Sequence, residues 1–220
     1  GYHTINNSFF DIAGLPAETI ETFLPTKTKY ITAQTFISRL VRDISFNLIT
    51  RFHLKWMIKK QMYFNLKNNQ FLYGKTTNII QSDLRPKFVF SHLMLPHYPF
   101  YFDERGNSHP YDTLFKDADK AKYLSYLKYA NSKYIALIDQ ILKNSKQPPL
   151  IIFMSDHGFR DYNADPEYLF VNICAVYFPD KEYSNFYNSL SGVNLFRVIL
   201  NTKFNQHLPI LKDSTIILKD

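Results

Sequence analysis

The residues best suited to chemistry form a turn motif, Ser155-Asp156-His157-Gly158, which directly follows an apolar run at 150–154. In an open α/β sheet, ligands gather at the carboxyl ends of the strands, and the motif occupies that position. A carboxylate and an imidazole on one turn can both point at one divalent ion, and Gly158 would let the backbone turn sharply behind them. Asp156 and His157 are therefore candidate metal ligands. The alternative is that Asp156 caps the next turn and His157 is merely exposed, because two ligands do not complete a site.

Two further imidazoles stand in segment 91–100. His92 lies within a predicted strand, and His97 lies just beyond its end, flanked by prolines that fix the backbone direction. We expect both to reach the same rim as Asp156. There they could bind a second metal, hydrogen-bond an anionic group, or act as acid and base near neutral pH. For His92, a hydrogen-bonded core histidine is an equally good interpretation.

No nucleophile can be identified from its sequence pattern. The chain has no Gly-x-Ser-x-Gly elbow and no phosphate-binding glycine-rich loop, and it has six glycines in all. Cys174 is the single cysteine, which excludes an intramolecular disulfide and a multi-cysteine zinc site; its place in an apolar strand predicts a core residue. The other histidines are predicted to lie at the surface: His3, His53, His109 and His207.

The elements that must position these residues follow an α/β order. Three nearly continuous apolar runs, 88–95, 150–155 and 170–178, are typical of strands covered on both faces. Apolar residues at three- and four-residue steps predict helices over 117–144 and 192–204, the second with Ser191 as its N-cap. The predicted fold class is α/β, with a mixed or mostly parallel sheet and helices on both faces.

The charge of the chain is concentrated in one segment. The net charge is +7, and residues 27–75 contain ten basic residues against one acid, Asp43, while the remainder carries −2. Within 31–67 the pattern is helix-like, and aromatic side chains alternate with the basic ones. We therefore predict one domain over 1–220 with a basic, aromatic-rich helical insertion at 27–80. Such a segment could contact an anionic membrane surface, although helices that cover a sheet produce the same pattern.

Other partners and locations are constrained less strongly. No DNA- or RNA-reading motif is present, so nucleic acid is not an expected partner. The longest apolar runs fall far short of the roughly 18 residues that a membrane-spanning helix needs. The chain opens on Gly1-Tyr2-His3 with neither Met nor a signal-peptide pattern, which is how an excised fragment would begin.

Together these segments resemble the C-terminal half of the catalytic domain of a sulfatase-like protein in the alkaline phosphatase superfamily. The similarity covers roughly 87–212, with a weaker part at 1–12. It rests on four segments: 92–100, the helix at 117–144, 150–158 and 191–201.

The resemblance implies an incomplete alkaline-phosphatase-like domain that transfers a phosphoryl or sulfuryl group of an anionic ester with the help of one or two divalent metal ions. Asp156 and His157 match the Asp-His pair that binds the metal, with Ca, Mg, Mn and Zn all open. His97 matches the histidine that contacts substrate oxygens or protonates the leaving group, and His92 matches a second-shell or second-metal residue less closely. The family's nucleophile and acidic ligand precede Gly1, so we expect a missing N-terminal half to be the partner that completes the site.

Two alternatives remain open. A phosphoethanolamine- or glycerophosphate-type transferase of the same fold would use a hydroxyl in place of water, and a non-enzymatic membrane-surface module would use the basic segment. The resemblance also implies a membrane-anchored parent with this domain outside the cytoplasm.

Overall fold

The computed structural model describes residues 1–12, 14–18, 36, 44, 51–52, 55–82, 86–114, 120–159, 168 and 170–214. These residues form two compact units, Gly1–Lys146 and Gln147–Asp220, and each is described by itself. The chain is a mixed α/β protein with small sheets and long helices. None of the helices in the described ranges combines the length and apolar character required to cross a membrane.

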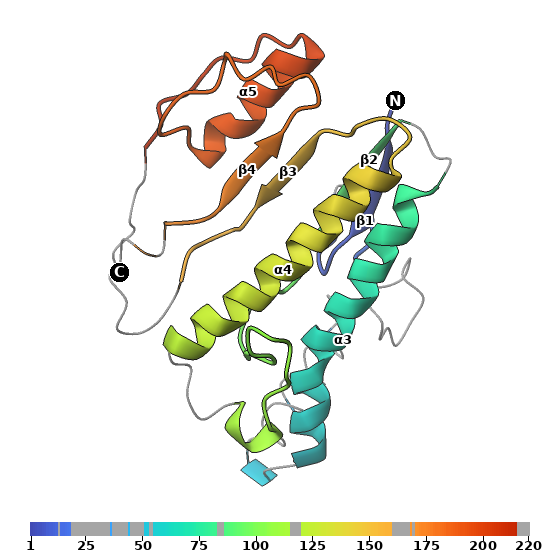
Figure 1. Cartoon of the computed structure of the whole chain (residues 1–220), viewed down its shortest axis with the longest axis vertical. Coiled ribbons are helices and arrows are strands. Elements are labelled where there is room, and N and C mark those ends of the chain that lie inside the picture. Colours follow the sequence, from blue (N-terminus) through green and yellow to red (C-terminus); the bar gives the residue numbers. More distant parts are fainter. Residues whose placement is uncertain are drawn as a thin grey trace. The chain divides into compact units, whose positions relative to one another are not determined.

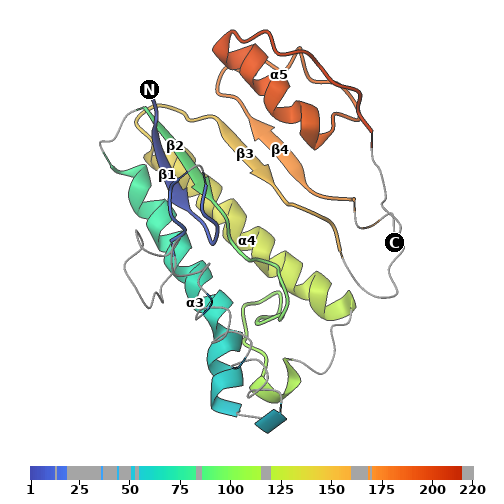
Figure 2. The same ribbon diagram turned by 180° about the vertical axis from the view of Figure 1, so that it is seen from behind.

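The first unit is built on a β-α-β crossover. Strand β1 (His3–Asn7) pairs in parallel with β2 (Lys87–Ser91), with His3 opposite Lys87 and Asn7 opposite Ser91. Parallel neighbours need a long connection, and helix α3 (Lys55–Ile80) lies within it. Helix α3 contacts both strands and runs beside α4 (Lys120–Asn144), as Figures 1 and 2 show.

Lys87, the first residue of β2, ties the sheet to the end of α3. Its Nζ donates to the carbonyls of Ile79 and Ile80, at 2.5 and 3.3 Å, and to the carbonyl of Ser82 at 3.3 Å. The last carbonyls of a helix lack intrahelical partners and carry a partial negative charge. A lysine here satisfies them and fixes where α3 ends relative to β2.

An aromatic cluster joins α3, α4 and the segment after β2. Phe100, Tyr101, Leu114 and Tyr126 form its buried centre, and residues of α3 and α4 pack around them. The Phe100 and Tyr126 rings lie 5.9 Å apart, a spacing at which aromatic pairs attract beyond their burial. Leu114 directly follows the short 3₁₀ helix η2 (Tyr111–Thr113). The cluster therefore fixes segment 98–102 against both helices.

The second unit is a helix packed on a two-stranded sheet. Strands β3 (Ile151–Met154) and β4 (Cys174–Tyr177) are antiparallel, and α5 (Gly192–Phe204) covers one face (Figure 1). Leu195, Val198 and Ile199, at steps of three and one, are buried, and Leu195 and Ile199 share a core with Phe178. Each such side chain stabilises the unit by about 1.5–3 kcal/mol when fully buried.

The predicted helices agree with the structure. The helix expected over 192–204 is α5, with Ser191 at the N-cap position and Asn205 in the left-handed conformation at its C-cap, but the Ser191 hydroxyl makes no capping hydrogen bond. The helix expected over 117–144 is α4; residues 115–119 lie outside the described residues. In the basic segment, α3 begins at Lys55 and continues to Ile80, well past 67, and most of 27–54 lies outside the described residues.

The predicted strands are real but shorter, and their expected burial is wrong. β2 ends at Ser91, so the last part of the run 88–95 is irregular chain. β4 begins at Cys174, so the first part of the run 170–178 is irregular. No side chain of β2, β3 or β4 is fully buried. Each strand has one described neighbour, and the β3–β4 sheet has one described covering helix; an apolar run alone could not show this.

Candidate metal and anion site residues

Asp156 and His157 lie on the turn that follows β3. The β3–β4 pairing continues one residue beyond Met154, because Ser155 N–H donates to the Ile173 carbonyl at 3.0 Å and Ile173 N–H donates to Ser155 Oγ at 3.1 Å. Asn172 adds a side-chain hydrogen bond to the Ser155 carbonyl at 2.9 Å. The turn therefore begins from a fixed residue.

The two side chains face each other. His157 Nε2 lies 3.6 Å from Asp156 Oδ2, and the side chains are 30% and 75% exposed. The other carboxylate oxygen, Oδ1, accepts the His157 backbone N–H at 3.0 Å. Through Oδ1, Asp156 therefore makes a local turn contact, as expected if its role were only to stabilise the turn. Its Oδ2 remains next to the imidazole.

The hydrogen bond of the second ring nitrogen fixes the proton of His157. Nδ1 lies 2.6 Å from the Gly158 carbonyl, which can only accept, so Nδ1 carries the hydrogen. In the neutral ring this leaves the lone pair on Nε2, the atom beside Asp156. A hydrogen bond from the non-ligating nitrogen to a backbone carbonyl is how metal-binding histidines are commonly oriented.

This donor pair fits a divalent ion. Two ligands at about 2.1 Å from one ion stand about 3.0–3.4 Å apart, so a separation of 3.6 Å needs only a small adjustment. When His157 is protonated, the same two atoms form an ion pair instead. Across the part of the chain that the structure describes, no three His, Cys, Asp or Glu side chains gather as a metal-ligating group.

Gly158 is required for a different reason from the one expected. Its φ does not lie in the left-handed region, so a sharp glycine-only turn is not what it provides. A Cβ at this position would stand 1.8 Å from the Tyr168 carbonyl oxygen and 2.7 Å from that of Val171. The backbone that leads into β4 therefore lies directly against the Asp-His turn, and only glycine leaves room for it.

His97 stands on a turn of the first unit, between two prolines. The peptide bonds Leu95-Pro96 and Tyr98-Pro99 are both cis. The ring is exposed, and its Nδ1–H donates to the Tyr98 carbonyl. As in His157, the proton is thereby placed on Nδ1, and Nε2 is the nitrogen that can exchange a proton with an external group.

His92 directly follows β2, not within the strand as expected. Its backbone N–H donates to the Asn7 carbonyl at 2.9 Å, which extends the parallel pairing by one residue. Three phenylalanine rings surround the imidazole: Phe9, Phe10 and Phe90, with centroids 6.5, 5.2 and 6.4 Å away. His92 and His97 belong to the first unit, and Asp156 and His157 belong to the second.

Sequence reasoning missed the polar side chains that hold segment 91–95. Thr76 on α3 contacts Ser91 Oγ at 2.7 Å and Asn7 Nδ2 at 3.3 Å. Asn69, about two turns earlier on α3, pairs with the backbone of Met94. Both α3 residues are buried and hydrogen-bonded, as buried polar groups usually are, but no local sequence pattern marks them.

Two predictions on single residues need correction. Cys174 is exposed and is not a core residue, although partial burial raises the pKa of its thiol. His109 is partly buried and not a plain surface residue, since its Nε2 has no contact with solvent and no hydrogen-bond partner among the described residues. His3 and His207 are exposed as predicted, and His53 lies outside the described residues.

The described chain is thus a mixed α/β protein with an acidic and an imidazole side chain together on the turn after a strand. The comparison with family sequence models is more specific, because residues 24–206 match the sulfatase family. The chain belongs to that family. Searches of curated proteins and of solved structures find no match.

Proposed function

We propose that this chain forms part of the catalytic domain of a metal-dependent sulfatase-family enzyme acting on sulfate or phosphate esters. Membership of the family supports a hydrolase or transferase, and the single observation that carries the metal assignment is the Asp156 Oδ2 to His157 Nε2 separation of 3.6 Å. Asp156 and His157 would hold the ion. The remaining coordination positions would be taken by water, by substrate or by groups outside the described residues.

The roles of the residues follow from their donors. A bound divalent ion would polarise the ester oxygens and neutralise the charge that develops on them. Asp156 contributes a hard oxygen, which suits Ca, Mg, Mn and Zn, and His157 adds a nitrogen, which favours Mn and Zn. His97 would contact the anionic oxygens, or protonate the leaving oxygen, through Nε2. His92, enclosed by phenylalanine rings, is proposed to assist from outside direct contact.

Metal binding tests the assignment without requiring turnover. We expect Mn²⁺ or Zn²⁺, added to the whole chain and followed by calorimetry and by elemental analysis after dialysis, to bind through Asp156 and His157. Asp156→Ala and His157→Ala should each weaken binding by at least about tenfold, the effect of losing roughly 1.4 kcal/mol of ligand contribution. His207→Ala removes an exposed histidine of the same unit and is the matched control. Unchanged affinity in both ligand variants would refute the site.

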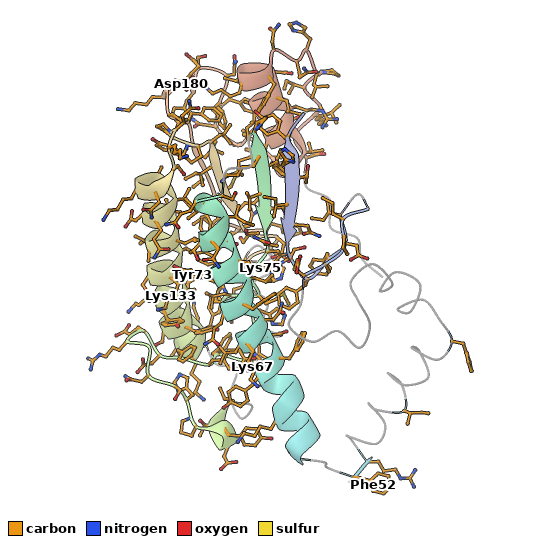
Figure 3. All side chains as sticks on the ribbon, turned by 90° about the vertical axis from the view of Figure 1, so that its right-hand side faces the viewer. Phe52, Lys67, Tyr73, Lys75, Lys133 and Asp180 are labelled. Atoms are coloured by element: carbon orange, nitrogen blue, oxygen red, sulfur yellow. The ribbon has the colours of Figure 1, made fainter. Side chains whose placement is uncertain are left out.

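A second candidate function is contact with an anionic membrane surface through the basic segment. Phe36 and Phe52 are 76% and 61% exposed, and Lys59 and Lys67 are exposed on α3; Phe52 and Lys67 are labelled in Figure 3. Exposed aromatics beside lysines suit the interface of an anionic bilayer. The charge available is smaller than the sequence suggests, because Lys75 is paired with Glu18 at 2.8 Å.

Vesicle sedimentation tests this second candidate. The chain should sediment with vesicles containing phosphatidylserine but not with neutral ones, and added salt should release it. Phe52→Ser should reduce binding, while Phe88→Ser, which changes an exposed phenylalanine of β2, should not. Equal binding to neutral and anionic vesicles would rule out the electrostatic mechanism.

A further inference from the structure

Side-chain hydrogen bonds from two helices, α3 and α4, hold the turn that carries His97. The nearer anchor is Asn69 on α3, which is 7% exposed. Its Nδ2 donates to the Met94 carbonyl at 2.7 Å, and its Oδ1 accepts the Met94 N–H at 2.7 Å. The carboxamide therefore pairs with both polar groups of one peptide residue, as a neighbouring strand would. Beyond His92, segment 93–95 has no strand partner among the described residues, and the Asn69 carboxamide takes the place of one at Met94.

The second anchor comes from α4. The Tyr134 hydroxyl donates to the Leu95 carbonyl at 2.8 Å, one residue beyond the Asn69 pair. Burial raises the pKa of Tyr134, so the hydroxyl stays protonated and remains a donor throughout the physiological range. Leu95 itself packs against the aromatic cluster.

The chain is fixed again immediately after His97. Tyr98 packs against the cluster, with its ring 5.5 Å from that of Phe100, and Phe100 is buried in the cluster centre. The exposed imidazole is thus carried by a turn held on both sides. The Tyr98 carbonyl, which accepts the Nδ1–H of His97, has its direction set by these anchors.

We propose that Asn69 and Tyr134 are positioning residues that hold the His97 turn so that Nδ1 keeps its proton and Nε2 faces the anionic group. The inference rests on the proposed function, in which His97 contacts substrate oxygens. Neither residue touches substrate; each acts through the backbone of Met94 or Leu95. If the anchors loosen, the Tyr98 carbonyl no longer points at Nδ1, and the ring exchanges between its two tautomers.

The test follows the tautomer of His97 in the whole chain by two-bond proton–nitrogen NMR, together with titration of inorganic phosphate. The native chain should show the Nδ1–H tautomer. Asn69→Asp keeps the acceptor for Met94 N–H but replaces the donor, and Tyr134→Phe removes one hydroxyl. Both should shift His97 toward a mixture of tautomers and weaken phosphate binding at its resonances roughly 3- to 10-fold, the equivalent of losing one hydrogen bond.

Two controls separate positioning from general loss of stability. Lys87→Met removes the hydrogen bonds at the end of α3 and destabilises the same unit, and Tyr126→Phe removes a buried α4 hydroxyl that has no hydrogen-bond partner among the described residues. Both controls should leave the His97 tautomer unchanged. A native tautomer in folded Asn69→Asp and Tyr134→Phe would overturn the proposal, as would equal shifts in the controls. If phosphate leaves His97 unmoved in the native chain, the substrate role of His97 fails, and the tautomer still decides the positioning role.

Discussion

The imidazole rings of His97 and His157 are oriented by the same kind of hydrogen bond. His97 and His157 each donate Nδ1–H to a backbone carbonyl of the next residue along, which leaves Nε2 as the reactive nitrogen. The difference lies in what stands beside Nε2. In His157 it is the carboxylate of Asp156, whereas the exposed ring of His97 forms no ion pair with a carboxylate among the described residues. The first arrangement suits a cation and the second suits an anion.

The sharpest prediction at this scale concerns Gly158. Gly158→Ala places a methyl group 1.8 Å from the Tyr168 carbonyl oxygen, which is backbone and cannot swing aside. The turn and segment 168–171 must separate, which overpacking data put at about 1–3 kcal/mol of unfolding free energy. We expect the loss to appear in urea unfolding, and we expect metal binding by Asp156 and His157 to weaken with it.

Gly192→Ala is the matched control for this substitution. Gly192 is the first residue of α5, and a Cβ there meets no atom within 4 Å. Alanine also has the higher helix propensity, so the free energy of unfolding should stay equal or rise by up to about 1 kcal/mol. Equal stability of Gly158→Ala and the native chain would show that the close approach at Gly158 does not exist in solution.

At the scale of elements, asparagine side chains on helices form paired hydrogen bonds with the backbone of extended segments. On α5, Asn194 pairs with both polar groups of the Leu211 backbone, and Asn201 does the same for Leu208. Seven residues of helix span about 10.5 Å, and three residues of extended chain span about 10 Å, so the two pairs are in register. Asn69 on α3 makes the same pair of hydrogen bonds with the backbone of Met94. These carboxamides hold segments that lack a described strand partner.

Asp213 completes the attachment of the C-terminal segment to α5. Its carboxylate accepts the Ser191 N–H at 2.9 Å and the Tyr187 hydroxyl at 2.6 Å, at the positive end of the helix. The hydrogen bonds from Ser191 and Tyr187 hold the pKa of Asp213 well below its usual range. The folded-state pKa is thus below the unfolded value of about 3.9, so this stabilisation is complete above about pH 5 and is lost as the pH falls toward the folded value.

Asp213→Asn should therefore have a pH-dependent effect. At pH 7 the variant should be less stable than the native chain, because the amide keeps the shape but not the charge. The gap should narrow as the pH is lowered from 5 to 3, because Asp213 becomes protonated in the unfolded state first, and this protonation favours unfolding of the native chain. Urea unfolding at several pH values measures this, and a gap that stays constant would assign the loss to geometry and not to charge.

The elements that could be predicted from sequence are those whose signals are local. Helix α5 was predictable because Ser191, the spacing of its apolar residues and its end lie within one short stretch. The end of β2 and the start of β4 could not be predicted, because the apolar run in each case extends beyond the residues that pair with another strand. Pairing depends on residues far away in sequence, and no local pattern encodes it.

The candidate site divides in the same way. Asp156 and His157 were predictable as a pair because they are adjacent and follow an apolar run, and the structure brings their side chains together. Asn69 and Tyr134 were not predictable, since their partners lie 25 and 39 residues away. Whether the four predicted residues carry the roles proposed for them stays a prediction.

At the scale of the whole molecule, the net charge is +7, so basic side chains outnumber the carboxylates that can compensate their repulsion. Several are held in the charged form by direct hydrogen bonds. Asn107 lowers the pKa of Asp103, Lys128 that of Glu104, Lys203 that of Asp180 and Ser184 that of Glu182. These groups occur in both units. Every one of them stabilises the folded state only while it is ionised.

Acid should therefore destabilise the chain in a predictable window. Each folded-state pKa lies below its unfolded value of about 4, so protonation favours the unfolded state once the pH drops below about 5. Neutralising carboxylates also leaves 26 Lys and Arg without compensation, which adds repulsion. The urea midpoint should fall steadily from pH 5 to pH 3. Moderate salt should recover the part due to repulsion but not the part due to lost hydrogen bonds, and a midpoint that stays constant over this range would contradict the argument.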